Sequence, residues 1–113
     1  MLMTNTTALP GAIADYLTAK QNHDTAALLA TLTEDAVITD EGKLYQGHDV
    51  IGAWSDQVSG EFAATYAIRE SVRILDRIVV AVEVTGNFPT SPATLFFHFT
   101  AREGKIAALT ILS

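Results

Sequence analysis

The chain has 113 residues, the size of one domain, and 49% of them are hydrophobic, which is enough to build a core. A formal net charge of −6 and few, scattered basic residues exclude a nucleic-acid-binding surface and disfavour an anionic membrane surface. The chain has no cysteine, so it has neither disulfides nor thiol chemistry, which fits a cytoplasmic protein. We therefore expect a single domain over 1–113, with a loose tail over 1–8.

Two helices are predicted near the N-terminus. Ile13, Tyr16 and Leu17 recur at the spacing of one helical face. Asp24 is placed to cap a second helix, which 33–35 should end. The apolar residues expected on the buried side of this second helix are Leu28, Leu29 and Leu32.

A short hairpin and a third helix are predicted next. The segment 36–39 has the composition of a strand, 40–42 that of an acidic turn, and 44–46 that of the returning strand. Gly47 should then begin a helix. Its apolar side is expected to carry Val50, Ile51 and Trp54.

From residue 61 onward the apolar period changes from helical to alternating, which is typical of half-buried strands. The pattern predicts strands over 61–74, 78–85, 94–102 and 105–112, with a hairpin turn at Glu103-Gly104. Helices followed by an antiparallel meander indicate an α+β fold, with the helices packed on one face of a curved sheet.

The strand over 94–102 is apolar on both of its faces. Leu95, Phe97 and Phe99 share one face, and Phe96 lies on the other. One face can pack on the helices, but the other needs a second cover, and in so short a chain a second subunit is the expected cover. The sequence therefore predicts a homodimer formed through the sheet.

Several short segments resemble the nuclear transport factor 2-like superfamily, also called the SnoaL-like or ketosteroid isomerase-like fold. They are the Asp24 cap, Thr-Glu-Asp-Ala-Val at 33–37, Asp40, and Gly-His-Asp-Val-Ile at 47–51. The resemblance implies a cone-shaped α+β roll in which three N-terminal helices pack on a curved, mostly antiparallel sheet and enclose an apolar pocket. Many members of this superfamily form dimers.

A narrower resemblance to bacterial ketosteroid isomerase covers 16–40 without a gap. It implies that Tyr16 is a donor to the substrate oxyanion and that Asp40 moves the proton. The position of the enzyme's second donor is held here by Phe96, and its supporting tyrosines correspond to Leu32 and approximately Ser55. Losing one oxyanion donor typically costs roughly a hundredfold in rate, so efficient steroid isomerisation is not expected.

Three residues are the candidates for catalysis, and each has a structural alternative. Asp40 is either a carboxylate in an apolar pocket or an ordinary turn residue. Tyr16 either donates into a pocket or is a core tyrosine bonded to a backbone carbonyl. His98 shares a strand face with Phe96, so it either lines the pocket as a donor or acid/base group, or lies at a sheet edge or subunit interface.

The other two histidines, His23 and His48, lie at helix starts and are interpreted as solvent-facing. The histidine spacing is not that of a metal site, so neither zinc nor another cofactor is expected. The residues expected to line the pocket and bind a ligand are Trp54, Phe62, Tyr66, Phe96, Leu109 and Ile111.

Three functions remain open from the sequence. The first is an isomerase, cyclase or dehydratase that moves a proton on a small apolar carbonyl compound, with Asp40 as base and Tyr16 as oxyanion donor. The second is a pocket that binds a small hydrophobic ligand without turnover, and the third is a dimerisation domain. Fold alone does not decide among them.

Overall fold

The computed structural model describes residues 9–113, except for the side chain of Phe62. The loose tail predicted for 1–8 therefore lies outside the described residues. The helices are α1 (Gly11–Gln21), α2 (Thr25–Ala30) and α3 (His48–Phe62). The strands are β1 (Leu32–Asp40), β2 (Lys43–Gln46), β3 (Thr65–Ile74), β4 (Arg77–Thr85), β5 (Ala93–Arg102) and β6 (Lys105–Leu112).

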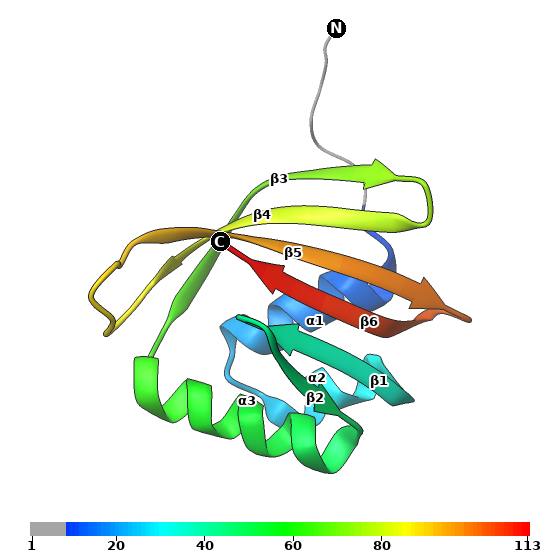
Figure 1. Cartoon of the computed structure of the whole chain (residues 1–113), viewed down its shortest axis with the longest axis horizontal. Helices are drawn as coiled ribbons and strands as arrows, with labels where there is room; N and C mark the ends of the chain where they lie inside the picture. The colour runs from blue at the N-terminus through cyan, green and yellow to red at the C-terminus, as the bar shows by residue number, and fades with distance from the viewer. Residues whose placement is uncertain (1–8) are drawn as a thin grey trace, which may run out of the picture.

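The six strands form one twisted sheet in the order β2-β1-β6-β5-β4-β3. Neighbouring strands are antiparallel except for β1 and β6, which run parallel. Helix α1 packs against β3 and β6, while α3 packs against β1 and β2 (Figure 1). The predicted α+β class, with three helices on a curved, mostly antiparallel sheet, is confirmed.

The second helix is capped as predicted, but it is shorter than expected. The Asp24 carboxylate accepts a hydrogen bond from the Ala27 backbone N–H, at 3.1 Å. The prediction that 33–35 end this helix was wrong, because they belong to β1, where the pairing with β6 shifts between Leu32 and Val37. Pairing with a distant strand has overridden the local helical pattern here.

His48 holds this irregular part of β1 instead of only facing solvent. Its ring Nε2 lies 3.1 Å from the Thr33 carbonyl oxygen and 3.4 Å from that of Leu32. The imidazole therefore links the start of α3 to β1. His23 is exposed, as expected.

Helix α3 is longer than its sequence pattern indicated. It continues to Phe62 and ends where Ala63 adopts a left-handed conformation with φ of 47°, so the strand predicted from 61 begins only at Thr65. Ile51 and Trp54 are buried as expected, whereas Val50 is 49% exposed. The buried side of the helix is thus narrower than the sequence pattern indicated.

One face of the sheet forms the core with the helices, and we call it the inner face. Directly paired residues on neighbouring strands share a face. One row of inner-face residues is Ile38, Leu109, Phe99 and Ile78, all of which are at most 3% exposed. The next row is Asp40, Ile111, Phe97 and Val80.

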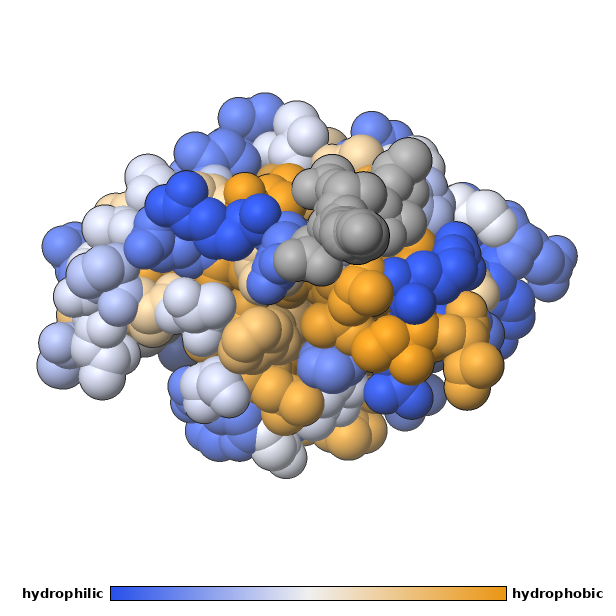
Figure 2. Space-filling model, turned by 90° about the horizontal axis from the view of Figure 1, so that it is seen from above, coloured by the Kyte–Doolittle hydropathy of each residue, from blue (hydrophilic) through white to orange (hydrophobic). Residues whose placement is uncertain are grey.

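None of the helices described for residues 9–113 covers the opposite face, which we call the outer face (Figure 1). Its central row contains Thr39, Thr110, His98, Val79 and Val72. Large apolar side chains are exposed in this row and in the next one, with Val72 at 46%, Phe96 at 39% and Leu112 at 48%. Seen from the β3 side, apolar areas interrupt the charged surface of the molecule (Figure 2).

Candidate functional site

Asp40 ends β1 on the inner face of the sheet. Its register partner on β6 is Ile111, which is 5% exposed and pairs in turn with the buried Phe97. Because residues in one row share a face, the carboxylate lies on the side of the core and is half-buried. Its neighbour Glu41, in the turn, is exposed instead.

Four effects, two in each direction, set the pKa of Asp40. Burial, the largest effect, and the nearby Glu41 carboxylate both raise its pKa above the ordinary value. A hydrogen bond from the Trp54 side chain and the positive charge of Lys20 lower it. The net result is a raised pKa, so the ionised carboxylate is a stronger base than an exposed aspartate.

Tyr16 reaches the same region from α1. It is fully buried, and its ring meets the edge of Phe99 with the centroids 5.5 Å apart. Within residues 9–113 its hydroxyl has no hydrogen-bond partner, so the alternative of a core tyrosine bonded to a backbone carbonyl is not what is observed. Burial, followed by the neighbouring Tyr66 and Asp40, raises the pKa of Tyr16 far above its usual value, so the hydroxyl keeps its proton.

Lys20 is a third polar group at this site, one that was not among the residues predicted from the sequence. The residue is only 4% exposed, and its ammonium nitrogen Nζ makes no hydrogen bond with any described group. Nζ lies 4.2 Å from the ring centroid of Trp54 and 5.9 Å from that of Tyr66. Burial lowers the pKa of Lys20 to about 8, against the opposing attraction of Asp40.

A sequence signal for Lys20 existed. The residue follows Tyr16 by four positions, so both side chains lie on one face of α1, one helical turn apart. A lysine at such a position is ordinarily assumed to extend into solvent, because its long stem can pack on apolar surface while its charge stays in water. Here the ammonium remains inside, between aromatic rings.

Aromatic side chains surround these polar groups. Trp54 is buried and packs on Tyr45 with the ring centroids 5.5 Å apart, and Tyr66 is half-buried. The side-chain amide of Gln21, at the end of α1, accepts a hydrogen bond of 2.7 Å from the Tyr66 backbone N–H. This bond ties the start of β3 to α1 and so positions Tyr66 beside Lys20.

The remaining residues predicted to bind a ligand are not all at this site. Leu109 and Ile111 are buried on the inner face, on the same side of the sheet as Asp40. The Phe62 side chain lies outside the described part of the structure. Phe96 lies on the outer face, and on β5 the inward position in the row of Asp40 is occupied by Phe97.

The structure also contradicts the proposed pocket position of His98. Successive side chains of a strand alternate between faces, and Phe97 and Phe99 are the buried pair that faces the helices. His98 must therefore lie on the outer face, with Val79 and Thr110 beside it. Partial burial and the positive charge of Arg77 lower its pKa, but neither Tyr16 nor Asp40 is on its side of the sheet.

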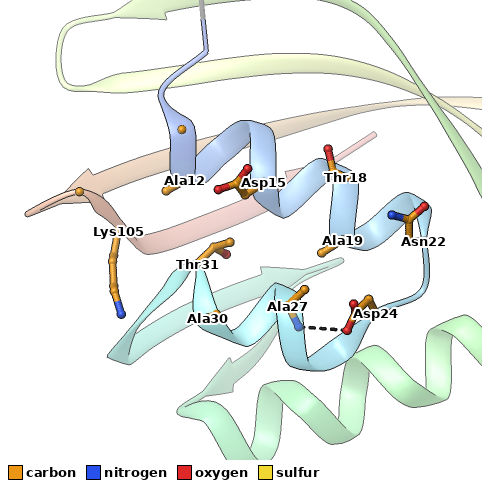
Figure 3. A pocket seen from close by; sticks show the side chains of 12 residues that line it. Ala12, Asp15, Thr18, Ala19, Asn22, Asp24, Ala27, Ala30, Thr31 and Lys105 are labelled. Carbon is orange, nitrogen blue, oxygen red and sulfur yellow. Dashed lines mark hydrogen bonds between the residues drawn. The ribbon is translucent and has the colours of Figure 1, made fainter.

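Surface hollows occur elsewhere in the described residues. One, of about 520 Å³, lies between α1 and α2, with Lys105 at its edge (Figure 3). A smaller one, of about 250 Å³, lies on the outer face beside Phe96. Neither is lined by Tyr16, Lys20 or Asp40.

Among residues 9–113, no group of three or more histidine, cysteine, aspartate or glutamate side chains is arranged to hold a metal ion. None of the helices in this part of the chain has the length and apolar character needed to cross a membrane.

The site thus combines three different polar groups in an apolar, aromatic environment. Asp40 is a carboxylate with a raised pKa, Tyr16 is a neutral hydroxyl donor, and Lys20 is a dehydrated ammonium group. They come from β1 and α1, elements that meet only in the folded chain. Such an arrangement can accept a proton from a bound molecule and donate hydrogen bonds to an oxygen atom of that molecule.

Comparison with known proteins identifies the family. A family model described as the SnoaL-like domain matches residues 13–109. The chain belongs to the SnoaL-like family. A structure of a proposed polyketide cyclase from Sinorhizobium meliloti is 37% identical to this SnoaL-like domain, with a TM-score of 0.88 over 91% of this chain and 94% of that one.

More distant structures share the fold of this SnoaL-like domain. A protein from Catenulispora acidiphila with a ketosteroid isomerase-like fold, in complex with trimethylamine, is 15% identical over 94% of this chain and 87% of that one, with a TM-score of 0.81. TerC, co-crystallised with polyporic acid, is 19% identical over 89% and 87% of the two chains, with a TM-score of 0.75. None of the curated proteins matches the sequence.

Proposed function

We propose that this SnoaL-like domain binds a small, largely apolar carbonyl compound and moves a proton on it without a cofactor. The observation that carries the proposal is the position of Asp40, a half-buried carboxylate of raised pKa on the same side of the sheet as the unpartnered hydroxyl of Tyr16. The similarity to a proposed polyketide cyclase at 37% identity supports this class of chemistry. Two structures of the same fold that contain small molecules support a small ligand.

In the proposed reaction the ionised Asp40 removes a proton from the carbon next to the carbonyl group. The electron pair of the broken C–H bond forms a C=C bond, and the carbonyl electrons move onto the oxygen. Tyr16 donates a hydrogen bond to this developing oxyanion. Returning the proton to another carbon gives isomerisation, attack of the enolate on a second carbonyl gives cyclisation, and loss of hydroxide that takes up a proton gives dehydration.

His98 has no part in this mechanism, because it lies on the outer face. The proposal thus depends on Asp40 and Tyr16 alone among the three residues that the sequence suggested. The apolar Phe97, which lies in the same row as Asp40 but two strands away on β5, supplies no hydrogen-bond donor. The alternative function is a pocket that binds a ligand without turnover.

The proposal is tested by hydrogen exchange in D₂O, with α-tetralone as a small apolar ketone probe. Replacing the base in Asp40→Asn should lower the rate of deuterium incorporation at the α-carbon by roughly a hundredfold or more, because an amide does not accept the proton. Tyr16→Phe should lower it by about tenfold to a hundredfold. Mass spectrometry of the recovered ketone measures both rates.

The matched control is Glu103→Gln, which removes an exposed carboxylate in the turn between β5 and β6 and should leave the rate within about twofold of wild type. Exchange that persists unchanged in Asp40→Asn would overturn the assignment of the base. A wild-type domain whose melting temperature rises with the ketone, but which exchanges no hydrogen, would support the ligand-binding alternative.

We also propose that the domain is a homodimer formed through the outer face. None of the described helices covers this face, and Phe96, Val72 and Leu112 are exposed there. Apolar side chains gathered on an uncovered sheet favour burial against a second copy of the same surface.

Sedimentation measurements test the dimer. At micromolar concentration the wild type should sediment as a dimer, and Phe96→Glu should shift it to a monomer, because two like charges would be buried at the interface. Leu75→Glu is the control, since Leu75 is 90% exposed in the turn after β3 and should leave the dimer intact. A wild type that sediments as a monomer at this concentration would contradict the proposal.

A further inference from the structure

The buried ammonium group of Lys20 lacks a hydrogen-bond acceptor among the described residues. An ammonium group has three N–H donors, and burying them without acceptors is costly. Among residues 9–113 the Lys20 Nζ contacts the faces of Trp54 and Tyr66, but it makes no hydrogen bond. Contact with the ring faces offsets part of the lost hydration, but aromatic faces do not replace the missing oxygen acceptors.

Tyr16 has the same unmet requirement. Its hydroxyl is completely buried and also lacks a partner. The two residues are separated by one turn of α1, so both donors project from one face of the helix toward the sheet. Both donors also interact with the Asp40 carboxylate, so both lack an acceptor in the same part of the site.

We infer that Lys20 is the second oxyanion donor of this site, and that its ammonium and the Tyr16 hydroxyl together bind the anionic oxygen of an enolate or phenolate. This inference rests on the proposed function and extends it to the class of ligand. In the resemblance to ketosteroid isomerase the second donor comes from the strand that is β5 here, where the inward residue is the apolar Phe97. In this chain the second donor comes from the helix.

The charges at the site favour this assignment. Before the reaction the negative charge is on Asp40, and Lys20 attracts it. After proton transfer Asp40 is neutral, and the negative charge is on the ligand oxygen. A fixed ammonium group that hydrogen-bonds that oxygen stabilises the charge where it develops, in surroundings from which water is largely excluded.

The titratable groups around Lys20 are Tyr16 on α1, Asp40 on β1 and Tyr66 on β3. Burial and Asp40 raise the pKa of Tyr66 to about 12, and burial raises that of Tyr16 further, so both tyrosines stay neutral. Lys20 is therefore the one cation in this set, and it is protonated below its pKa of about 8.

The test uses 4-nitrophenol, whose phenolate mimics an enolate and is distinguished from the phenol by its visible absorption. The wild type should bind the phenolate more tightly than the phenol, which lowers the apparent pKa of the bound ligand. Lys20→Met should reduce this preference by roughly tenfold to a hundredfold, because a hydrogen bond to a charged group is lost. Lys105→Met, which removes an exposed lysine, is the control and should leave the preference unchanged.

Asp40→Asn separates this inference from the proposed function. It should lower the rate of hydrogen exchange by roughly a hundredfold or more. It should keep or strengthen the phenolate preference, because it removes a neighbouring negative charge. The inference would be wrong if a folded Lys20→Met variant kept the wild-type preference for the phenolate. It would also be wrong if borohydride reduction linked α-tetralone covalently to Lys20. In the second case the amine would form an imine, and would not act as an ammonium donor.

Discussion

Replacing Phe99 by alanine is expected to lower the free energy of unfolding by about 3–5 kcal/mol. Phe99 is 1% exposed and packs on the rings of Tyr16 and Phe97, with centroid distances of 5.5 and 6.1 Å. Its removal leaves a cavity between the sheet and α1, and it also removes two aromatic contacts. Because a domain of this size is stable by only about 5–15 kcal/mol, the loss is a large part of the total.

Urea unfolding followed by circular dichroism measures this effect, and Phe96→Ala is its matched control. Phe96 is the same residue type on the same strand, but it is on the outer face and 39% exposed. Its substitution should cost well under half as much at protein concentrations low enough to favour the monomer. Equal losses in the two variants would contradict the assignment of inner and outer faces on β5.

The second large effect is expected from Lys20→Met, which should stabilise the fold at neutral pH. The ordinary lysine pKa of 10.5 falls to about 8 in the folded protein, a difference that corresponds to about 3 kcal/mol of unfavourable burial of the charged form. Loss of the contact between the ammonium and Trp54 offsets roughly 0.5–2 kcal/mol of this gain. We expect a net gain of about 1–3 kcal/mol at pH 7.

The pH dependence of this gain has a definite sign. Below about pH 8 Lys20 is protonated in both the folded and unfolded states, so the wild type carries the full burial cost. Between about pH 8 and 10.5 the unfolded state binds more protons, so the stability contributed by Lys20 rises with pH. The advantage of Lys20→Met should therefore shrink steadily above pH 8, as unfolding measurements at pH 7.0 and 9.5 would reveal. An advantage that does not change with pH, or a destabilised variant, would contradict this account.

A more stable Lys20→Met variant would indicate that Lys20 serves function and not the stability of the fold. A buried cation that lowers the stability of the fold is typical of a site at which stability is given up for binding or chemistry. The phenolate measurement and the unfolding measurement on the same variant should then change in opposite directions.

Most of the fold could be predicted from the sequence, because local patterns and final structure agree over the strands of the second half. The strand over 105–112 has the predicted bounds, since a clear alternation follows the Glu103-Gly104 turn. The wrongly predicted boundaries lie where contacts with residues distant in sequence determine the secondary structure. The segment 33–35 joins β1 because β6 pairs beside it, and α3 continues past residue 61, where an alternating pattern already begins.

The site was predictable only in part, and for two separate reasons. Tyr16 and Asp40 were found through a family resemblance, and the structure puts both on the core side of the sheet. The face of His98 was assigned wrongly because β5 is apolar on both faces, so its alternation does not distinguish inside from outside. Lys20 was missed because nothing in the residue type indicates that its charge is buried.

The parallel pairing of β1 with β6 has a consequence for how the protein acquires its site. Asp40 is aligned by Ile111, which is 71 positions later in the chain, so the carboxylate is not fixed until β6 has been synthesised. Contacts of such long sequence separation slow folding, because a large loop must close before they form. A nascent chain that has emerged only as far as β5 would carry the base and the helix donors, but it would lack the strand that sets Asp40 in register beside them.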